Sequence, residues 1–205
     1  MIKKAIKFIR QLQSNDSTGH DFWHSMRVYR MAVHIAKKEK ADLKVTALAA
    51  LLHDVEDWKF TEKSGKVQKW LKRNGASAEL TKEVCGIIEH VSYKGAGVAD
   101  KMVSLEGQIV QDADRLDALG AIGIARTFAY GGSKGRAIYD PEVKPVMHAT
   151  FKSYKKNQSH SINHFYEKLL LLKNRMHTKT AKKIAGERHR RLEIFLQDFM
   201  DEWNA

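Results

Sequence analysis

The sequence has very little cysteine or proline. Its 205 residues include a single cysteine, Cys85, and two prolines, Pro141 and Pro145. One cysteine excludes both an intrachain disulfide and a thiolate zinc site, so nothing indicates an oxidising compartment. No apolar run approaches the ~18 residues of a transmembrane helix. Residues 1–10 alternate charged and apolar side chains, which is typical of an amphipathic helix and not of a signal peptide. We therefore expect a soluble, cytoplasmic protein.

Alternating β-branched stretches are also lacking, and apolar residues recur at helical spacing along most of the chain. The sequence predicts an all-α fold, a single compact helical domain over 1–205 with additional C-terminal helices. Its core spans about 20–125 and its C-terminal helices about 160–204. The predicted helices cover about 2–12, 21–38, 42–52, 63–72, 78–91, 104–119, 162–176 and 178–203. Asp42 and Thr178 are the predicted N-caps of the helices that begin with them. Both prolines and a glycine cluster predict a long basic connection over about 130–158.

Positive charge is in excess, with 36 Lys and Arg against 24 Asp and Glu and a formal net charge of +12. The charge is densest over 173–191, where Glu187 is the only acidic residue. Such a segment could contact nucleic acid. However, its charges surround the helix and no helix-turn-helix or aromatic RNA-binding motif accompanies it, which favours a solvated helix face. We prefer the interpretation that the excess positive charge creates an electrostatic field that attracts a small polyanion to the protein.

Polar side chains interrupt three of the predicted apolar stripes. Asp112 occupies a core-facing position in the stripe 105, 109, 112, 116, 119, and a buried carboxylate must be protonated, paired or bound to a metal. Asp54 interrupts a second stripe, with His53 beside it, and His24 begins a third. Each of these residues alone is more often structural than a ligand. Together they predict a metal site with two imidazoles and two carboxylates, a ligand set that suits divalent transition metals.

Four segments carry a family resemblance, namely Gly-His-Asp-Phe-Trp-His-Ser-Met-Arg-Val (19–28), Leu-Leu-His-Asp-Val-Glu-Asp (51–57), Ile-Ile-Glu-His-Val-Ser-Tyr-Lys-Gly (87–95) and Gln-Asp-Ala-Asp-Arg-Leu-Asp-Ala-Leu-Gly (111–120). With the pattern His24, His53-Asp54 and Asp112, the chain resembles the HD-domain metal-dependent phosphohydrolases. It is most similar to small stand-alone bacterial members, which include nucleoside triphosphate pyrophosphohydrolases. The resemblance implies an all-α fold, a phosphorylated small-molecule substrate such as a nucleotide, and hydrolysis assisted by a divalent metal.

We expect one metal ion, because His90 is not followed by a second histidine. Manganese is the first expectation, with nickel, cobalt, iron, zinc or magnesium as alternatives. Asp57 is the candidate general base or acid, since it lies three residues after Asp54, and Glu56 is the second choice. The candidate substrate contacts are His20, His90, Lys94 and Arg115.

Three alternatives remain open. His20, Asp21 and His24 have the spacing of a zincin motif, although its second position is normally glutamate. A nucleoside monophosphate phosphatase or another phosphoesterase would use the same metal site. A third alternative is a protein that binds nucleotide or nucleic acid without turnover.

Arg188 interrupts the apolar stripe of the last predicted helix, which predicts a buried acidic partner or a substrate phosphate.

Overall fold

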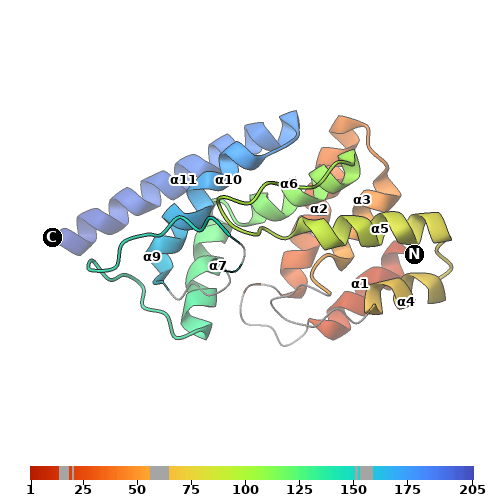
Figure 1. The fold of residues 1–205 in the computed structure, drawn as a ribbon, viewed down its shortest axis with the longest axis horizontal. Helices are drawn as coiled ribbons and strands as arrows, with labels where there is room; N and C mark the ends of the chain where they lie inside the picture. Colours follow the sequence, from red (N-terminus) through yellow and green to blue (C-terminus); the bar gives the residue numbers. More distant parts are fainter. Residues whose placement is uncertain (14–18, 20, 56–64, 151, 153–158) are drawn as a thin grey trace. The chain divides into compact units, whose positions relative to one another are not determined.

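The computed structural model describes residues 1–13, 19, 21–55, 65–150, 152 and 159–205. All regular structure in these ranges is helical, which confirms the predicted all-α fold (Figure 1). No helix within them combines the length and apolarity needed to cross a membrane. The chain divides into two compact units. The first comprises Met1–Tyr93 and Asp100–Asp114, and the second comprises Lys94–Ala99 and Arg115–Ala205.

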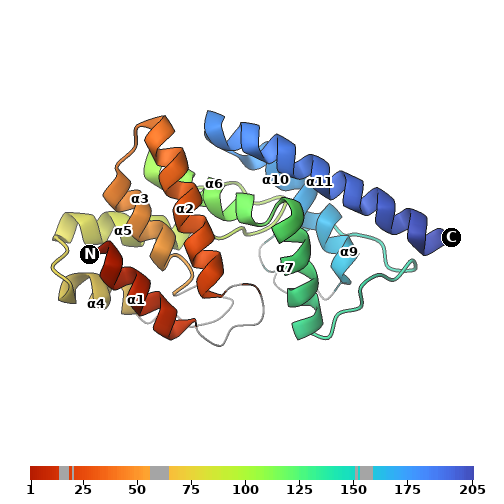
Figure 2. The ribbon, with the colours of Figure 1, turned by 180° about the vertical axis from the view of Figure 1, so that it is seen from behind.

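The first unit is built around α3. Its helices are α1 (Ile2–Leu12), α2 (Phe22–Glu39), α3 (Leu43–Leu52), α4 (Lys66–Arg73), α5 (Ala78–Val91) and most of α6 (Leu105–Asp117). Helix α3 packs against α1, α2 and α5, and Figure 2 shows α1, α2 and α3 side by side. Residues 45–52 are all buried, because after Lys44 this helix carries no charged side chain on any face. The described residues that follow α3, which are His53, Asp54 and Val55, are buried as well.

Side-chain caps fix where these helices begin. The Asp42 carboxylate accepts hydrogen bonds from the amides of Lys44 and Val45 at 2.7 and 2.9 Å, which confirms the predicted N-cap of α3. Asp21 accepts from the amide of His24 at 2.8 Å and caps α2 in the same way. Each cap satisfies main-chain amides that have no partner within the helix, and it fixes the residue at which the helix begins.

The second unit consists of α7 (Gly120–Ser133), α9 (Ser161–His164), the π-helical turn η1 (Phe165–Leu169), α10 (Leu170–Leu172), the 3₁₀ turn η2 (Lys173–Arg175) and α11 (Lys179–Asn204). Helix α7 packs against α9 and α11. Rings of Phe128, Phe165 and Phe195 meet in its core with centroids 5.5 to 6.0 Å apart. Thr178 caps α11 by accepting from the amide of Ala181, as its sequence predicts.

Helix α7 was not predicted, and its last turn extends into the expected connection. The helix continues through Gly131 and Gly132, although glycine lowers helix propensity. Gly131 is required by packing: a Cβ there would lie 2.2 Å from the Ser161 hydroxyl oxygen at the start of α9. Burial against α9 and α11 therefore outweighs the local preference of the glycines.

The described part of the long connection is anchored to α9 and η1. The side chains of His160 and Asn163 bind the Val143 carbonyl at 3.2 and 2.8 Å. Glu167, which is buried, accepts from the amide of Val146 at 3.0 Å. These three side chains give residues 143–146 a fixed path without secondary structure of their own.

Candidate metal centre

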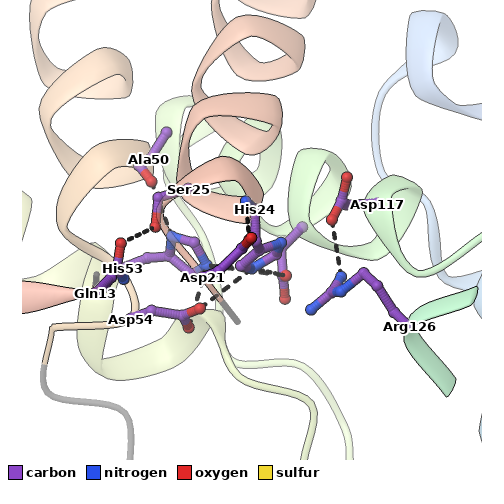
Figure 3. A network of polar contacts seen from close by, with 10 residues as sticks. Gln13, Asp21, His24, Ser25, Ala50, His53, Asp54, Asp117 and Arg126 are labelled. Carbon is purple, nitrogen blue, oxygen red and sulfur yellow. Dashed lines mark hydrogen bonds and ion pairs between the residues drawn. The ribbon is translucent and has the colours of Figure 1, made fainter. Parts of the chain in front are cut away.

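Two buried imidazoles face each other in the first unit. His24 belongs to the first turn of α2, and His53 follows the last residue of α3. Their Nε2 atoms are 3.3 Å apart, and both residues are almost completely buried (Figure 3). The caps of α2 and α3 set these positions, so two helices deliver one imidazole each to the same point.

The hydrogen bond of His53 defines which of its ring nitrogens carries the proton. Its Nδ1 lies 2.8 Å from the carbonyl oxygen of Ala50. A carbonyl accepts only, so Nδ1 must donate, and in the neutral imidazole Nε2 then holds a lone pair. That lone pair is directed at His24, which is the arrangement of a metal ligand oriented by a backbone carbonyl.

Two carboxylates complete the cluster. Asp54 places one oxygen 3.2 Å from Nε2 of His24 and the other 3.2 Å from Nε2 of His53. Asp114, on α6, places Oδ1 3.5 and 3.9 Å from the same two nitrogens. The Asp54 side chain is 5% exposed and that of Asp114 is 27% exposed. The cluster is therefore more exposed to solvent at Asp114 than at Asp54.

The structure adds a second aspartate of α6 to the candidate ligands. Asp112 is fully buried, as its place in the apolar stripe predicts, but the carboxylate that joins the imidazoles is Asp114. Residues two positions apart in a helix are separated by about 200° around its axis, so the side chains of Asp112 and Asp114 leave α6 in nearly opposite directions. The sequence held a signal for Asp114 in its Asp-Ala-Asp motif. The rule based on apolar stripes selected the more buried of the two aspartates.

The cluster fits a divalent cation. Ligand atoms about 2.1 Å from one ion lie about 3.0 Å apart at right angles and about 3.4 Å apart at tetrahedral angles. The nitrogen and oxygen atoms of His24, His53 and Asp114 lie within 4.8 Å of one another, and Asp54 contacts both imidazoles. Nitrogen and carboxylate oxygen donors in this mixture suit divalent transition metals. The four residues can therefore hold such an ion.

The remaining predicted site residues have different surroundings. Glu56, Asp57 and His20 lie outside the described residues. His90 is half-buried near the end of α5, and its Nδ1 donates to the carbonyl of Gly86 at 3.0 Å. Lys94 is half-buried in the segment after α5. Of the described residues, neither His90 nor Lys94 belongs to the group of His24, His53 and Asp114.

Arg115 and Arg188, the two arginines singled out in the sequence, both donate to main-chain carbonyls. Arg115 is buried and donates to the carbonyl of Arg175 at 2.5 Å. Arg188 donates to the carbonyl of Leu116 at 2.5 Å. Burial lowers the pKa of the Arg188 guanidinium, and the Asp117 carboxylate opposes that shift. Both arginines therefore have structural partners inside the second unit.

The zincin alternative loses its proposed base. That motif would use Asp21 as the acidic residue between two histidines. Asp21 instead caps α2, because its carboxylate accepts from the amide of His24. His24 is paired with His53 and Asp54, which lie far from it in the sequence. The geometry is that of a cluster assembled from several helices.

Comparison with known proteins identifies the family. The HD domain family model matches residues 22–119. The uncharacterized protein YpgQ of Bacillus subtilis is 38% identical over 187 residues, which cover 89% of this chain and 83% of YpgQ. The crystal structure of YpgQ in complex with ADP superposes with a TM-score of 0.79 and 32% identity, covering 98% of this chain and 97% of YpgQ.

Two further solved structures are similar over almost the whole chain. A Lactobacillus plantarum protein has a TM-score of 0.92 and 39% identity, covering 99% of this chain and 96% of its own. An HD-superfamily hydrolase of Bacillus thuringiensis has a TM-score of 0.76 and 45% identity, covering 100% and 97%. This chain belongs to the HD-domain family and is a metal-dependent phosphohydrolase.

Proposed function

We propose that this protein hydrolyses a nucleoside triphosphate to the monophosphate and pyrophosphate, with Mn²⁺ as its preferred metal. The observation that carries the proposal is the cluster of His24, His53, Asp54 and Asp114, two imidazoles and two carboxylates with one accessible side. The ADP complex of YpgQ supports a nucleotide as the ligand class. The net charge of +12 supports attraction of a polyanionic substrate.

In this reaction, water attacks the α-phosphorus, a new P–O bond forms, and the bond to the β-phosphate breaks. A bound divalent metal would acidify the attacking water and polarise a phosphoryl oxygen. The chain supplies the neutral imidazole of His53, fixed by the Ala50 carbonyl, and the Asp54 carboxylate beside it. Asp57 is the proposed group that takes the proton from water, and Glu56 is the alternative.

Three of the four residues of the cluster are shielded from bulk water. His24, His53 and Asp54 are buried, so their donor atoms lie in a medium of low dielectric constant where charge interactions are strong. Asp114 borders the accessible side. A phosphate group that enters beside Asp114 meets the proposed metal directly.

A nucleotide panel tests the proposal. Metal-free protein is supplied with Mn²⁺ and with each common nucleoside mono-, di- and triphosphate, and pyrophosphate and orthophosphate are measured separately. We expect pyrophosphate from triphosphates. His24→Ala and Asp54→Ala should lower kcat/KM by more than about 100-fold, since even outer-shell partners of a metal contribute about 10- to 100-fold.

Asp198→Asn is the matched control, because it removes one exposed carboxylate on α11. It should retain full activity. Orthophosphate released from monophosphates would instead identify a nucleotidase. Binding of nucleotide without any turnover under these conditions would refute the proposed reaction.

A further inference from the structure

The segment that joins α5 to α6 contains the sequence Lys94-Gly95-Ala96-Gly97-Val98 (Figure 1). One guanidinium group holds its main chain. Arg175 donates hydrogen bonds to the carbonyls of Gly95 at 3.2 Å and Val98 at 3.1 Å, and also to that of Ala96. Its own carbonyl accepts from Arg115. Three carbonyls of one short loop thus point to the same side chain.

Two glycines make this conformation possible. Gly95 has a φ of 124°, a region that other L-residues rarely adopt. Gly97 donates its amide to the carbonyl of His148 at 3.2 Å, and a Cβ at this position would lie 2.8 Å from the Cα of Ala149. The loop is therefore fixed from two directions, by Arg175 and by the segment at 148–149.

This arrangement directs the amide of Ala96 away from Arg175. The peptide unit is planar and trans, so its N–H points opposite to its C=O. Because the carbonyl of Gly95 points at the guanidinium, the amide of Ala96 points away from it. Within the described part of the chain, the amides of Gly95 and Ala96 have no hydrogen-bond acceptor, although Gly95 is buried and Ala96 half-buried. Such amides are normally satisfied by a protein group, water or a ligand.

The cation adjacent to these amides is Lys94. Lys94 is half-buried, and no carboxylate among the described residues pairs with it. The ammonium group and the two amides are donors only, and consecutive main-chain amides of this kind form concave sites for anions. A tetrahedral oxyanion offers several acceptor oxygens to such a set.

We propose that Lys94, Gly95 and Ala96 form a binding site for a phosphoryl oxyanion, and that Arg175 is the positioning residue that holds their amides in place. Arg175 is assigned no contact with the anion, because both of its terminal nitrogens already donate to carbonyls. The chemical class is a phosphate group, whether it belongs to a nucleotide, to pyrophosphate or to free phosphate. The site requires no metal, so it stands or falls separately from the reaction proposed above.

Amide NMR spectroscopy of ¹⁵N-labelled, metal-free protein tests this site directly. Orthophosphate, pyrophosphate and ADP are titrated in separate arms, with adenosine as the probe that lacks phosphate. We expect saturable shifts of the Gly95 and Ala96 amides with the three phosphorylated probes and none with adenosine. The probe with the lowest Kd identifies the source of the phosphate group. Absence of saturable shifts at both amides in all three arms would overturn the proposal.

Variants separate the two parts of the proposal. Lys94→Gln should weaken binding about tenfold, as expected for the loss of one charge-assisted hydrogen bond. Lys101→Gln, which removes an exposed lysine nearby in the sequence, should leave the Kd unchanged. Equal losses in both variants would indicate a general effect of positive charge and would overturn the site.

Arg175→Gln should abolish the phosphate-induced shifts at both amides even though Lys94 remains. Arg175→Lys should restore part of them, since a lysine can still donate to one or two carbonyls. Gly95→Ala perturbs the loop without touching Arg175 and should have the same effect, so the test survives if Arg175→Gln folds poorly. Unchanged phosphate binding in Gly95→Ala would show that loop geometry is irrelevant and would overturn the positioning role.

Discussion

Replacing Asp114 by asparagine distinguishes the two aspartates of α6 as metal ligands. The Asp114 Oδ1 lies 3.5 Å from Nε2 of His24 and 3.9 Å from Nε2 of His53. Asparagine keeps the shape of the side chain but removes the negative charge and one oxygen. Since outer-shell partners alone contribute about 10- to 100-fold to metal affinity, loss of a ligand should weaken Mn²⁺ binding by about 100-fold or more, or about 2.7 kcal/mol.

The matched variant is Asp112→Asn, which makes the same chemical change two residues earlier on the same helix. Asp112 is fully buried, and the metal-ligand cluster includes Asp114 in its place. We therefore expect Asp112→Asn to lower the free energy of unfolding while its Kd for Mn²⁺ stays within about threefold, well below the effect of losing a ligand.

Isothermal titration calorimetry with Mn²⁺ measures both affinities on metal-free protein, and urea unfolding shows that each variant is folded. The assignment of Asp114 would be refuted if Asp112→Asn lost metal binding while Asp114→Asn retained it. A loss confined to Asp114→Asn supports the cluster as the structure presents it.

Three further predictions concern stability. Arg126→Met should lower the free energy of unfolding by about 3 kcal/mol, because it removes the guanidinium that lies 2.9 Å from the buried Asp117 carboxylate. Urea unfolding measures this difference, and a change below about 1 kcal/mol would contradict the prediction. Gly131→Ala should destabilise the protein by about 1–3 kcal/mol, since the new Cβ meets the Ser161 hydroxyl of α9. Gly132→Ala, whose Cβ would have nothing within 4 Å, should stabilise it by about 0.5–1 kcal/mol. The thermal unfolding midpoints of the two variants should therefore shift in opposite directions. Burial, and then a neighbouring lysine, lower the pKa of His189, so the unfolded chain binds its proton more readily and stability is lost as the pH falls below the ordinary value of about 6.5. Urea midpoints at pH 7 and pH 5 should therefore differ less in His189→Gln than in the parent protein, and an equal difference would contradict the assignment.

Local rules were sufficient for most helices of the fold. The helices at 2–12 and 78–91 begin and end where apolar periodicity predicts, and the caps at Asp42 and Thr178 are confirmed. Helix α7 was missed because its glycines weaken the local signal, while its stability comes from packing against α9 and α11. Tertiary burial of this kind leaves no periodic trace that a window of sequence can show.

The candidate metal centre was predictable as far as single helices define it. A histidine in the first turn of α2 and a His-Asp pair at the end of α3 were both expected to point inward, and the structure brings His24, His53 and Asp54 together. The choice between Asp112 and Asp114 depends on the rotation of α6 about its axis relative to α2 and α3. Hydrophobic periodicity predicts which side of α6 is buried, but it does not predict which of its edges faces the imidazoles.

The contacts of Arg175 could not be predicted from sequence for a different reason. Its partners are main-chain carbonyls, which every residue possesses, so no residue type marks the acceptors in advance. The loop leaves a trace only where the backbone needs glycine, at Gly95 for its positive φ and at Gly97 for the close approach of Ala149. The pattern of Lys94, Gly95 and Gly97 in the sequence is therefore only weak evidence for an anion site. It becomes evidence for an anion site only once a guanidinium elsewhere in the chain is seen to bind the carbonyls and leave the amides unpaired.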